Sequence, residues 1–279
     1  MNSSLTTKSL SIACGLIVFA LTLGHAWAQT NQPAATPNAN PPSIPADVTQ
    51  ALQMSAGPDQ AKAVGTAATQ WAKTDPYAFV TWAAAQPPNI FALVRGSGAA
   101  CGLSTAPETA ANWLATQNTD QTKGLLHVML IRWTLTTPAA AEAWCATSGL
   151  SKDVRYLAYF TVGDGLCRKD PALATAWAAQ LPPGDDHLAA IHGIALIWAR
   201  GNIASTTAWI KQLNPQDMKW AALAVAETWG MVKGGGPSLE GWLDQLSLSA
   251  TDKAEVLKGP HPDEYHYSKY QPNPSPAAH

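Results

Sequence analysis

The sequence predicts an all-α protein, an α-solenoid of about six helical hairpins, and three observations lead to this prediction. Tryptophans recur every 31–33 residues, a proline precedes each of the first four by six residues, and alanine is abundant while alternating β-branched residues are scarce. A fixed period of roughly 20–50 residues is typical of arrays of supersecondary units. The periodic residues are Trp82, Trp113, Trp144, Trp177, Trp209 and Trp242.

Each repeat is predicted to contain a turn and then a second helix that carries the periodic tryptophan. Asp75 with Pro76, and Asp170 with Pro171, are typical helix starts. Asp accepts hydrogen bonds as an N-cap, and Pro at the first helical position lacks only an N–H that has no helical partner. Pro107 and Pro138 stand at the same position in two other repeats. In the fifth repeat Asn202 supplies an N-cap but no proline follows it, and residues 234–237 of the last repeat differ more from this helix start.

A first helix is predicted to end shortly before each of these starts. Five residues before the proline position stand Trp71, Gly102, Trp133, Leu166 and Trp198. Two helices and two short turns fit the observed period.

The tryptophans are predicted to form the repeat core, because small residues one helical turn away leave room for an indole from a neighbouring helix. The alternative is a row of indoles lining a sugar or quaternary-ammonium site. Trp220 lies outside the period and is the candidate for a surface contact. The predicted core residues are Trp71, Trp82, Trp113, Trp133, Trp144, Trp177, Trp198, Trp209 and Trp242.

The pattern Trp-Ala-x-x-Asp-Pro at residues 71–76, and its continuation to a Leu-Pro pair at residues 169–182, resembles a tandem repeat of uncharacterised exported bacterial proteins. The resemblance covers about residues 70–247. It implies a helical-hairpin solenoid like those of the tetratricopeptide class, although that class's own consensus is not matched closely. It implies no catalytic residues.

The two ends of the chain differ from the repeats. Residues 1–28 are predicted to be a signal peptide, because Lys8 precedes an apolar run over residues 10–23 and Ala26 and Ala28 suit cleavage before Gln29. The alternatives are an uncleaved anchor, for which the run is short, and a lipoprotein modified at Cys14. Residues 29–45 are predicted to be a disordered linker, 46–258 the helical repeat domain and 259–279 a disordered tail. We therefore expect the protein in the periplasm or outside the cell, with only transient membrane contact through the signal peptide.

Composition limits the partners of this protein. Charged residues make up 13% of the chain and the formal net charge is −2, so the concentrated basic face that nucleic-acid binding requires is not expected. After signal cleavage Cys101, Cys145 and Cys167 remain, which allows at most one internal disulfide. Their positions on apolar helix faces suggest small buried hydrophobic residues, and their spacing does not suit a metal site.

Other chemical groups form no recognisable catalytic motif. His187 and His192 are five residues apart, whereas zinc-binding helices prefer a spacing of four. His261 and His266, with Asp263 and Glu264, allow adventitious metal binding in the tail. The acids Glu227, Glu240 and Asp244 allow a carboxylate pair for glycoside hydrolysis, but solvated helix charges explain them equally well.

The sequence therefore predicts a non-catalytic protein, without cofactor or metal, that binds a protein or peptide partner or acts as a scaffold in the bacterial cell envelope. The alternative is a cell-wall or glycan-binding module that uses exposed tryptophans. An enzyme of unknown class is the third hypothesis.

Overall fold

The computed structural model describes residues 43–117, 119–146, 149–232 and 238–259. Regular structure in these ranges is entirely helical, which confirms the all-α prediction for the described residues. None of the helices found there is long and apolar enough to cross a membrane. The predicted signal peptide, most of the predicted linker and the tail beyond Gly259 lie outside the described residues.

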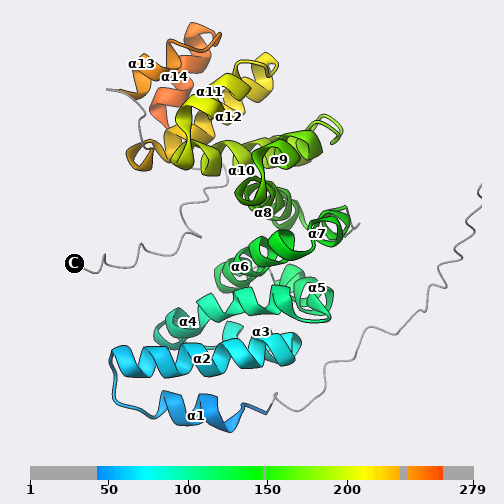
Figure 1. The fold of residues 1–279 in the computed structure, drawn as a ribbon, viewed down its shortest axis with the longest axis vertical. Coiled ribbons are helices and arrows are strands. Elements are labelled where there is room, and N and C mark those ends of the chain that lie inside the picture. The colour runs from blue at the N-terminus through cyan, green and yellow to red at the C-terminus, as the bar shows by residue number, and fades with distance from the viewer. Residues whose placement is uncertain (1–42, 118, 147–148, 233–237, 260–279) are drawn as a thin grey trace, which may run out of the picture. The chain divides into compact units, whose positions relative to one another are not determined.

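Long and short helices alternate along the described chain (Figure 1). The long elements are α2 (Pro58–Thr74), α6 (Asp120–Thr136), α8 (Lys152–Lys169), α10 (Asp185–Gly201) and α12 (Pro215–Glu227). The 3₁₀ helix η1 (Arg95–Leu103) takes the place of a long helix in the series and is counted with them, although it has only nine residues. The short elements are α3 (Pro76–Ala84), α5 (Pro107–Gln117), α7 (Pro138–Cys145), α9 (Pro171–Ala178), α11 (Ile203–Ile210) and α13 (Leu239–Leu243). Outside this alternation are α1 (Ala46–Leu52), α4 (Pro88–Val94), η2 (Trp229–Met231) and α14 (Ala250–Lys258).

The short helices begin where the sequence predicts. Pro76, Pro107, Pro138 and Pro171 are the first residues of α3, α5, α7 and α9. The Asp75 carboxylate accepts a hydrogen bond from the Ala78 amide at 3.0 Å, and Asn202 caps α11 in the same way, through the Ser205 amide. These caps satisfy amides that a helix start otherwise leaves without partners.

The long elements pack on one another in chain order. Contacts run from α2 to η1, then to α6, α8, α10, α12 and α14. The short helices α5, α7, α9 and α11 each contact the long element before and the long element after them. The buried apolar side chains form one continuous cluster that extends from Val48 in α1 to Val256 in α14.

Glycines allow some of the long elements to approach backbone to backbone. A Cβ atom on Gly193 of α10 would lie 2.0 Å from the Phe160 carbonyl oxygen of α8. A Cβ atom on Gly102 of η1 would lie 2.5 Å from the Met129 carbonyl oxygen of α6. Gly102 occupies the position that Trp71 and Trp133 occupy in their repeats, so no indole can be placed at this position of η1.

We predict that Gly193→Ala destabilises the protein by about 3 kcal/mol, since the new methyl group meets rigid backbone and forces α8 and α10 apart. Gly65→Ala is the matched control, because that helical glycine has open space around it. It is expected to stabilise α2 by about 0.5–1 kcal/mol. Urea unfolding of both variants measures the difference, and equal stabilities would show that the close contact is absent in solution.

Candidate functional site

Pairs of tryptophans join the two helices of several hairpins. The ring centroids are 5.2 Å apart for Trp71 and Trp82 and 6.2 Å apart for Trp133 and Trp144. The equivalent pair of Trp198 and Trp209 lies at 5.8 Å. In each pair the residue before the turn contacts the periodic tryptophan after it, and the rings are tilted by 37–47°.

In two repeats the position before the turn is not a tryptophan, and the periodic tryptophan after the turn contacts a tyrosine instead. Trp177, whose repeat has Leu166 at the first position, stacks on Tyr159 of α8 at 5.9 Å. Trp113, whose repeat has Gly102, makes an edge contact with Tyr77 of the preceding short helix at 6.3 Å. The periodic indole therefore keeps an aromatic contact in both irregular repeats.

The predicted core tryptophans fall into two groups. Trp71, Trp82, Trp133, Trp144 and Trp242 are buried, with Trp133 only 1% exposed. Trp113, Trp177, Trp198 and Trp209 are half-buried and pack against the core. Trp220, the candidate for a surface contact, is also half-buried, and its ring centroid lies 6.4 Å from that of His192. None of the tryptophans within the described ranges belongs to the exposed large hydrophobic residues.

One side of the long helices faces away from these aromatic contacts. On a helix each residue turns by about 100°, so positions about half a turn from Trp71, Trp133, Tyr159 or Trp198 lie opposite the short helices. We call this side the long-helix face. Its members are Lys62, Thr66 and Thr69 on α2, Val128, Ile131 and Leu135 on α6, Arg168 on α8, and Arg200 on α10.

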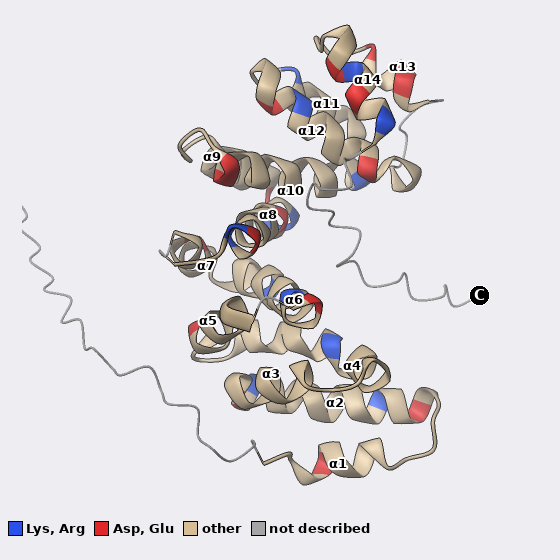
Figure 2. Cartoon of the chain, turned by 180° about the vertical axis from the view of Figure 1, so that it is seen from behind, with Lys and Arg blue, Asp and Glu red and all other residues tan. Residues whose placement is uncertain are grey.

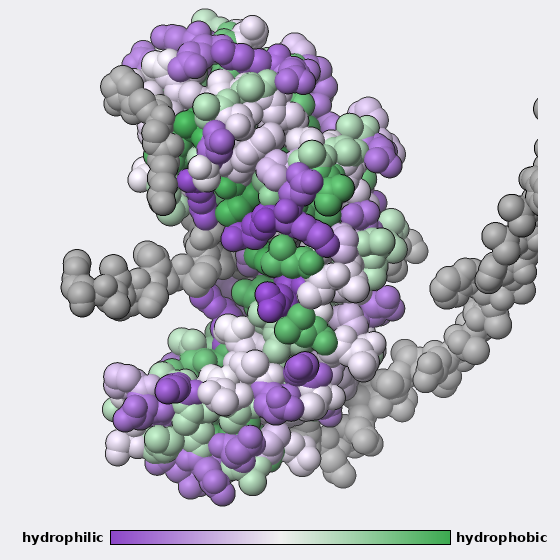
Figure 3. All heavy atoms as spheres, viewed as in Figure 1, coloured by the Kyte–Doolittle hydropathy of each residue, from purple (hydrophilic) through white to green (hydrophobic). Residues whose placement is uncertain are grey.

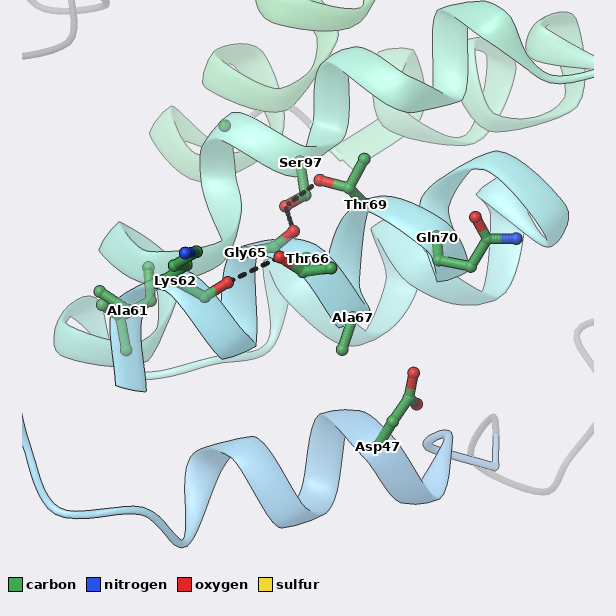
Figure 4. A pocket seen from close by; sticks show the side chains of 11 residues that line it. Asp47, Ala61, Lys62, Gly65, Thr66, Ala67, Thr69, Gln70 and Ser97 are labelled. Carbon is green, nitrogen blue, oxygen red and sulfur yellow. Dashed lines mark hydrogen bonds between the residues drawn. The ribbon is translucent and has the colours of Figure 1, made fainter. Parts of the chain in front are cut away.

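An open groove lies at the N-terminal end of the long-helix face, between α1, α2 and η1 (Figure 4). Lys62, Thr66 and Gln70 follow one another at intervals of one helical turn along α2, and Asp47 points toward them from α1. The side chains of Lys62 and Gln70 are exposed, with no hydrogen bond or ion pair to other described residues. The groove thus presents a cation, an anion and an amide to a ligand.

Further from the groove opening, the hydroxyl groups of the site already have partners. Thr69 Oγ1 donates to Ser97 Oγ at 3.1 Å, and Ser97 Oγ donates to the Gly65 carbonyl at 3.2 Å. These bonds tie η1 to α2 (Figure 4). Thr69, Ser97 and the Gly65 carbonyl therefore hold the two helices together. Only the exposed side chains nearer the opening of the groove are available to bind a ligand.

Polar pairs, most of them ion pairs, connect the first turns of consecutive long helices. Lys123 of α6 contacts Asp153 of α8 at 3.3 Å, and Arg155 of α8 makes two hydrogen bonds to Asp186 of α10, at 2.6 and 2.7 Å. The hydrogen bonds with Asp186 raise the pKa of Arg155. His187 of α10 contacts the last acid of the series at 2.9 Å, which is Asp217 of α12. Each acid also lies at a helix N-terminus, where the macrodipole favours negative charge.

The two helical histidines that the sequence singles out serve different helix contacts. His187 Nε2 lies against Asp217, and its Nδ1 lies 3.0 Å from the Ala178 carbonyl. His192 shares a 2.8 Å hydrogen bond between Nδ1 and the Tyr156 hydroxyl, while Nε2 lies 3.3 Å from Glu227 without a well-aligned bond. The cluster of Tyr156, His192 and Glu227 links α8, α10 and α12, and its imidazole is only 2% exposed.

The structure does not bring the three candidate acids into one pair. Glu227 lies beside His192, Asp244 pairs with Lys253 at 3.0 Å, and Glu240 is exposed in the first turn of α13. No group of three potential metal ligands occurs in the part of the chain that the structure describes. His261 and His266 lie outside that part. Elsewhere charged residues are sparse over the helices and gather around α13 and α14 (Figure 2).

Burial shifts the pKa values of the three cysteines and of one further histidine, so that all four are in their neutral form at neutral pH. Cys101, Cys145 and Cys167 are free and buried, and burial raises the thiol pKa of Cys101 and of Cys167 to about 12. Burial also raises the pKa of Cys145. Since the thiolate is the nucleophile, these thiols are poor nucleophiles at neutral pH. Burial, with the charges of Arg168 and Arg95, lowers the pKa of His127 to about 3.

Sequence reasoning missed several members of these clusters. Trp229 pairs with Trp242 at 5.5 Å, but thirteen residues separate them where eleven separate the other pairs. Tyr156 and His127 carry no local motif, because their partners His192 and Thr161 are one repeat away. Each of these two residues precedes its polar partner by about one repeat length, and this spacing could have predicted the contacts. Comparison of this chain with protein-family models, curated proteins and solved structures finds no match.

We predict that Trp144→Ala lowers the free energy of unfolding by about 3–5 kcal/mol, as a truncation in the core. The indole is buried, contacts Trp133 and donates from Nε1 to Asn112 Oδ1 at 2.8 Å. Trp144→Phe keeps part of the packing and is expected to cost less. A loss under about 1 kcal/mol for the alanine variant in urea unfolding would place this ring outside the core.

We predict that stability falls as the pH is lowered through the range between about 6.5 and 3, partly because of His127. Its imidazole is neutral when folded, so the unfolded chain binds one more proton in this window and the loss approaches about 1.4 kcal/mol per pH unit. Unfolding of the wild type and of His127→Gln at pH 7.5 and 5.5 isolates this contribution. An identical pH dependence of the two proteins would contradict it.

Proposed function

We propose that the helices form an α-solenoid of about six hairpins that binds a protein or peptide partner as a scaffold. The order of contacts supports this arrangement, since the most extensive contacts between long elements join consecutive members of the series. Such arrays expose one extended side, because every hairpin buries its other surfaces against adjacent hairpins. The long-helix face is the corresponding surface of this chain.

The groove at α1, α2 and η1 is the observation that carries the proposed binding role. Lys62, Gln70 and Asp47 offer donors and acceptors along an exposed helix, at a spacing that suits the main-chain and side-chain groups of an extended peptide. The buried groups argue for binding rather than catalysis, because the thiols have raised pKa values and His192 is closed to solvent.

A glycan-binding role has less support. Stacking on a sugar requires an exposed aromatic face, whereas the described tryptophans are buried or half-buried. We also propose that the protein acts in the periplasm or outside the cell. That part of the proposal rests on the sequence of residues 1–28, which carries an apolar run and a suitable cleavage site after Ala28.

The decisive experiment is affinity capture from cell-envelope extract with three tagged proteins. These are the wild type, the groove variant Lys62→Glu with Gln70→Ala, and the control variant Lys211→Glu, which changes an exposed charge next to α11. We expect one reproducible protein partner with the wild type and the control, and roughly tenfold less with the groove variant. Recovery of no partner would contradict the binding role, and equal recovery with all three would exclude the groove as the contact.

A further inference from the structure

The polar pairs between consecutive helices follow one rule. In each pair a Lys, Arg or His of one helix contacts an acid in the first turn of the next helix. The position of the acid is regular, and Asp186, for example, lies twelve residues before Trp198. The pairs are Lys123 with Asp153, Arg155 with Asp186, His187 with Asp217 and, beyond the long helices, Lys219 with Asp252 of α14.

At the N-terminal end of the array both members of such a pair lack a partner. Asp59 is in the first turn of α2 and lies twelve residues before Trp71, but the preceding helix α1 contains no basic residue. Lys62 follows within one helical turn, and the next elements, over residues 88–103, contain no acid. Both side chains are exposed, and neither makes an ion pair with another described residue.

These charges line the groove at α1, α2 and η1. A second hollow, between α1 and the start of α2, shares Asp47 and Lys62 with the groove and adds Asp59. Asp47 points toward Ala67, which is more than one helical turn beyond Lys62 (Figure 4). The charges along α2 therefore alternate, from Asp59 through Lys62 to Asp47 of the neighbouring helix.

The surface around these charges is only weakly apolar. Figure 3 shows hydrophilic residues over α1 and α2, with weakly hydrophobic ones between them. Between the charges the groove is lined by small side chains such as Ala63 and Thr66, which let the main chain of a ligand come close. From Asp59 to Ala67 the axis of α2 rises by about 12 Å, the length of about four residues of extended chain.

We propose that the groove takes an extended peptide segment in which one acidic side chain stands between two basic ones. The acid pairs with Lys62 and replaces the acid that η1 lacks. The basic side chains lie beside Asp59 and Asp47, and the first of them replaces the base that α1 lacks. Two acids beside a single lysine repel a segment with consecutive acids, so the alternation of charge selects the partner.

The stability of α2 does not depend on filling these positions. An exposed ion pair contributes little to folding, so the missing partners cost the helix little and leave its charges to a ligand. This inference rests on the proposed binding role of the same groove, and it adds the charge pattern of the partner.

Selection from a random dodecapeptide library displayed on phage, with the immobilised full chain, tests the pattern. We expect the enriched peptides to share an acid with a basic residue on each side, and Lys62→Glu to lower their affinity roughly tenfold. Lys211→Glu is the control and is expected to bind as the wild type does. Enriched peptides without this pattern, no enriched peptide, or an affinity that Lys62→Glu leaves unchanged would overturn the proposal.

Neutral variants separate the two kinds of contact. Asp47→Asn with Asp59→Asn keeps the size of both side chains, and the same selection on this protein is expected to retain the acid and to lose the flanking bases. Retention of both flanking bases would exclude these two carboxylates as contacts.

A variant of η1 supplies the missing acid within the chain. Gly96 lines the groove together with Lys62, and a Cβ atom at this position has open space around it. Gly96→Asp is expected to pair with Lys62 and to weaken the binding of a labelled enriched peptide roughly tenfold in fluorescence anisotropy. Gly96→Ala is the matched control, with the affinity of the wild type expected. Equal affinities of these two variants would show that the acid of the peptide does not contact Lys62.

The selection and the capture experiment can fail separately. A captured partner that requires the groove, together with enriched peptides that lack the pattern, would retain the binding role and overturn the charge assignment. Peptides with the pattern but no captured protein would support the charge assignment and contradict the role as a scaffold in the cell envelope.

Discussion

The aromatic contact between the two helices of a hairpin is the interaction on which most of the repeats depend. A short helix of eight or nine residues, such as α3 or α7, has little stability of its own in water. The pairs of Trp71 with Trp82 and of Trp133 with Trp144 give these helices a large apolar surface to cover. The regular spacing of the tryptophans in these hairpins follows from this requirement, because each pair joins a first helix to the helix after the turn. Trp113, which contacts Tyr77 of the preceding hairpin, is the exception.

The contacts between hairpins use a different chemistry. At their first turns the long helices are joined by polar pairs, from Lys123 with Asp153 to His187 with Asp217. Along their middles they are joined by close backbone packing at glycines such as Gly193 and by buried hydrogen bonds such as that of Tyr156 with His192. Polar pairs of this kind fix the register between helices, since a shift of one residue would leave a buried group without its partner.

The sequence predicts the parts of the fold that are local in the chain. The starts of α3 and α9 follow from Asp-Pro pairs whose chemistry acts within one helical turn. The replacement of a regular first helix by α4 and η1 in the second repeat was not predicted. Gly102 was the available sign, because it stands where other repeats have a large residue, but its partner Met129 lies 27 residues later. The cluster around His192 was missed for the same reason, since it joins three successive repeats.

The same reasoning supports the proposal that the long-helix face is the surface that binds a partner. The side of each long helix toward the short helices carries the indoles, and the sides toward its neighbours carry the glycines and the polar pairs. A substitution on any of these three sides disturbs a contact that the array requires. Residues on the long-helix face, such as Lys62 and Ile131, make none of these three kinds of contact. Their mixture of charge and half-buried apolar surface therefore supports the proposal that this side of the long helices contacts a partner.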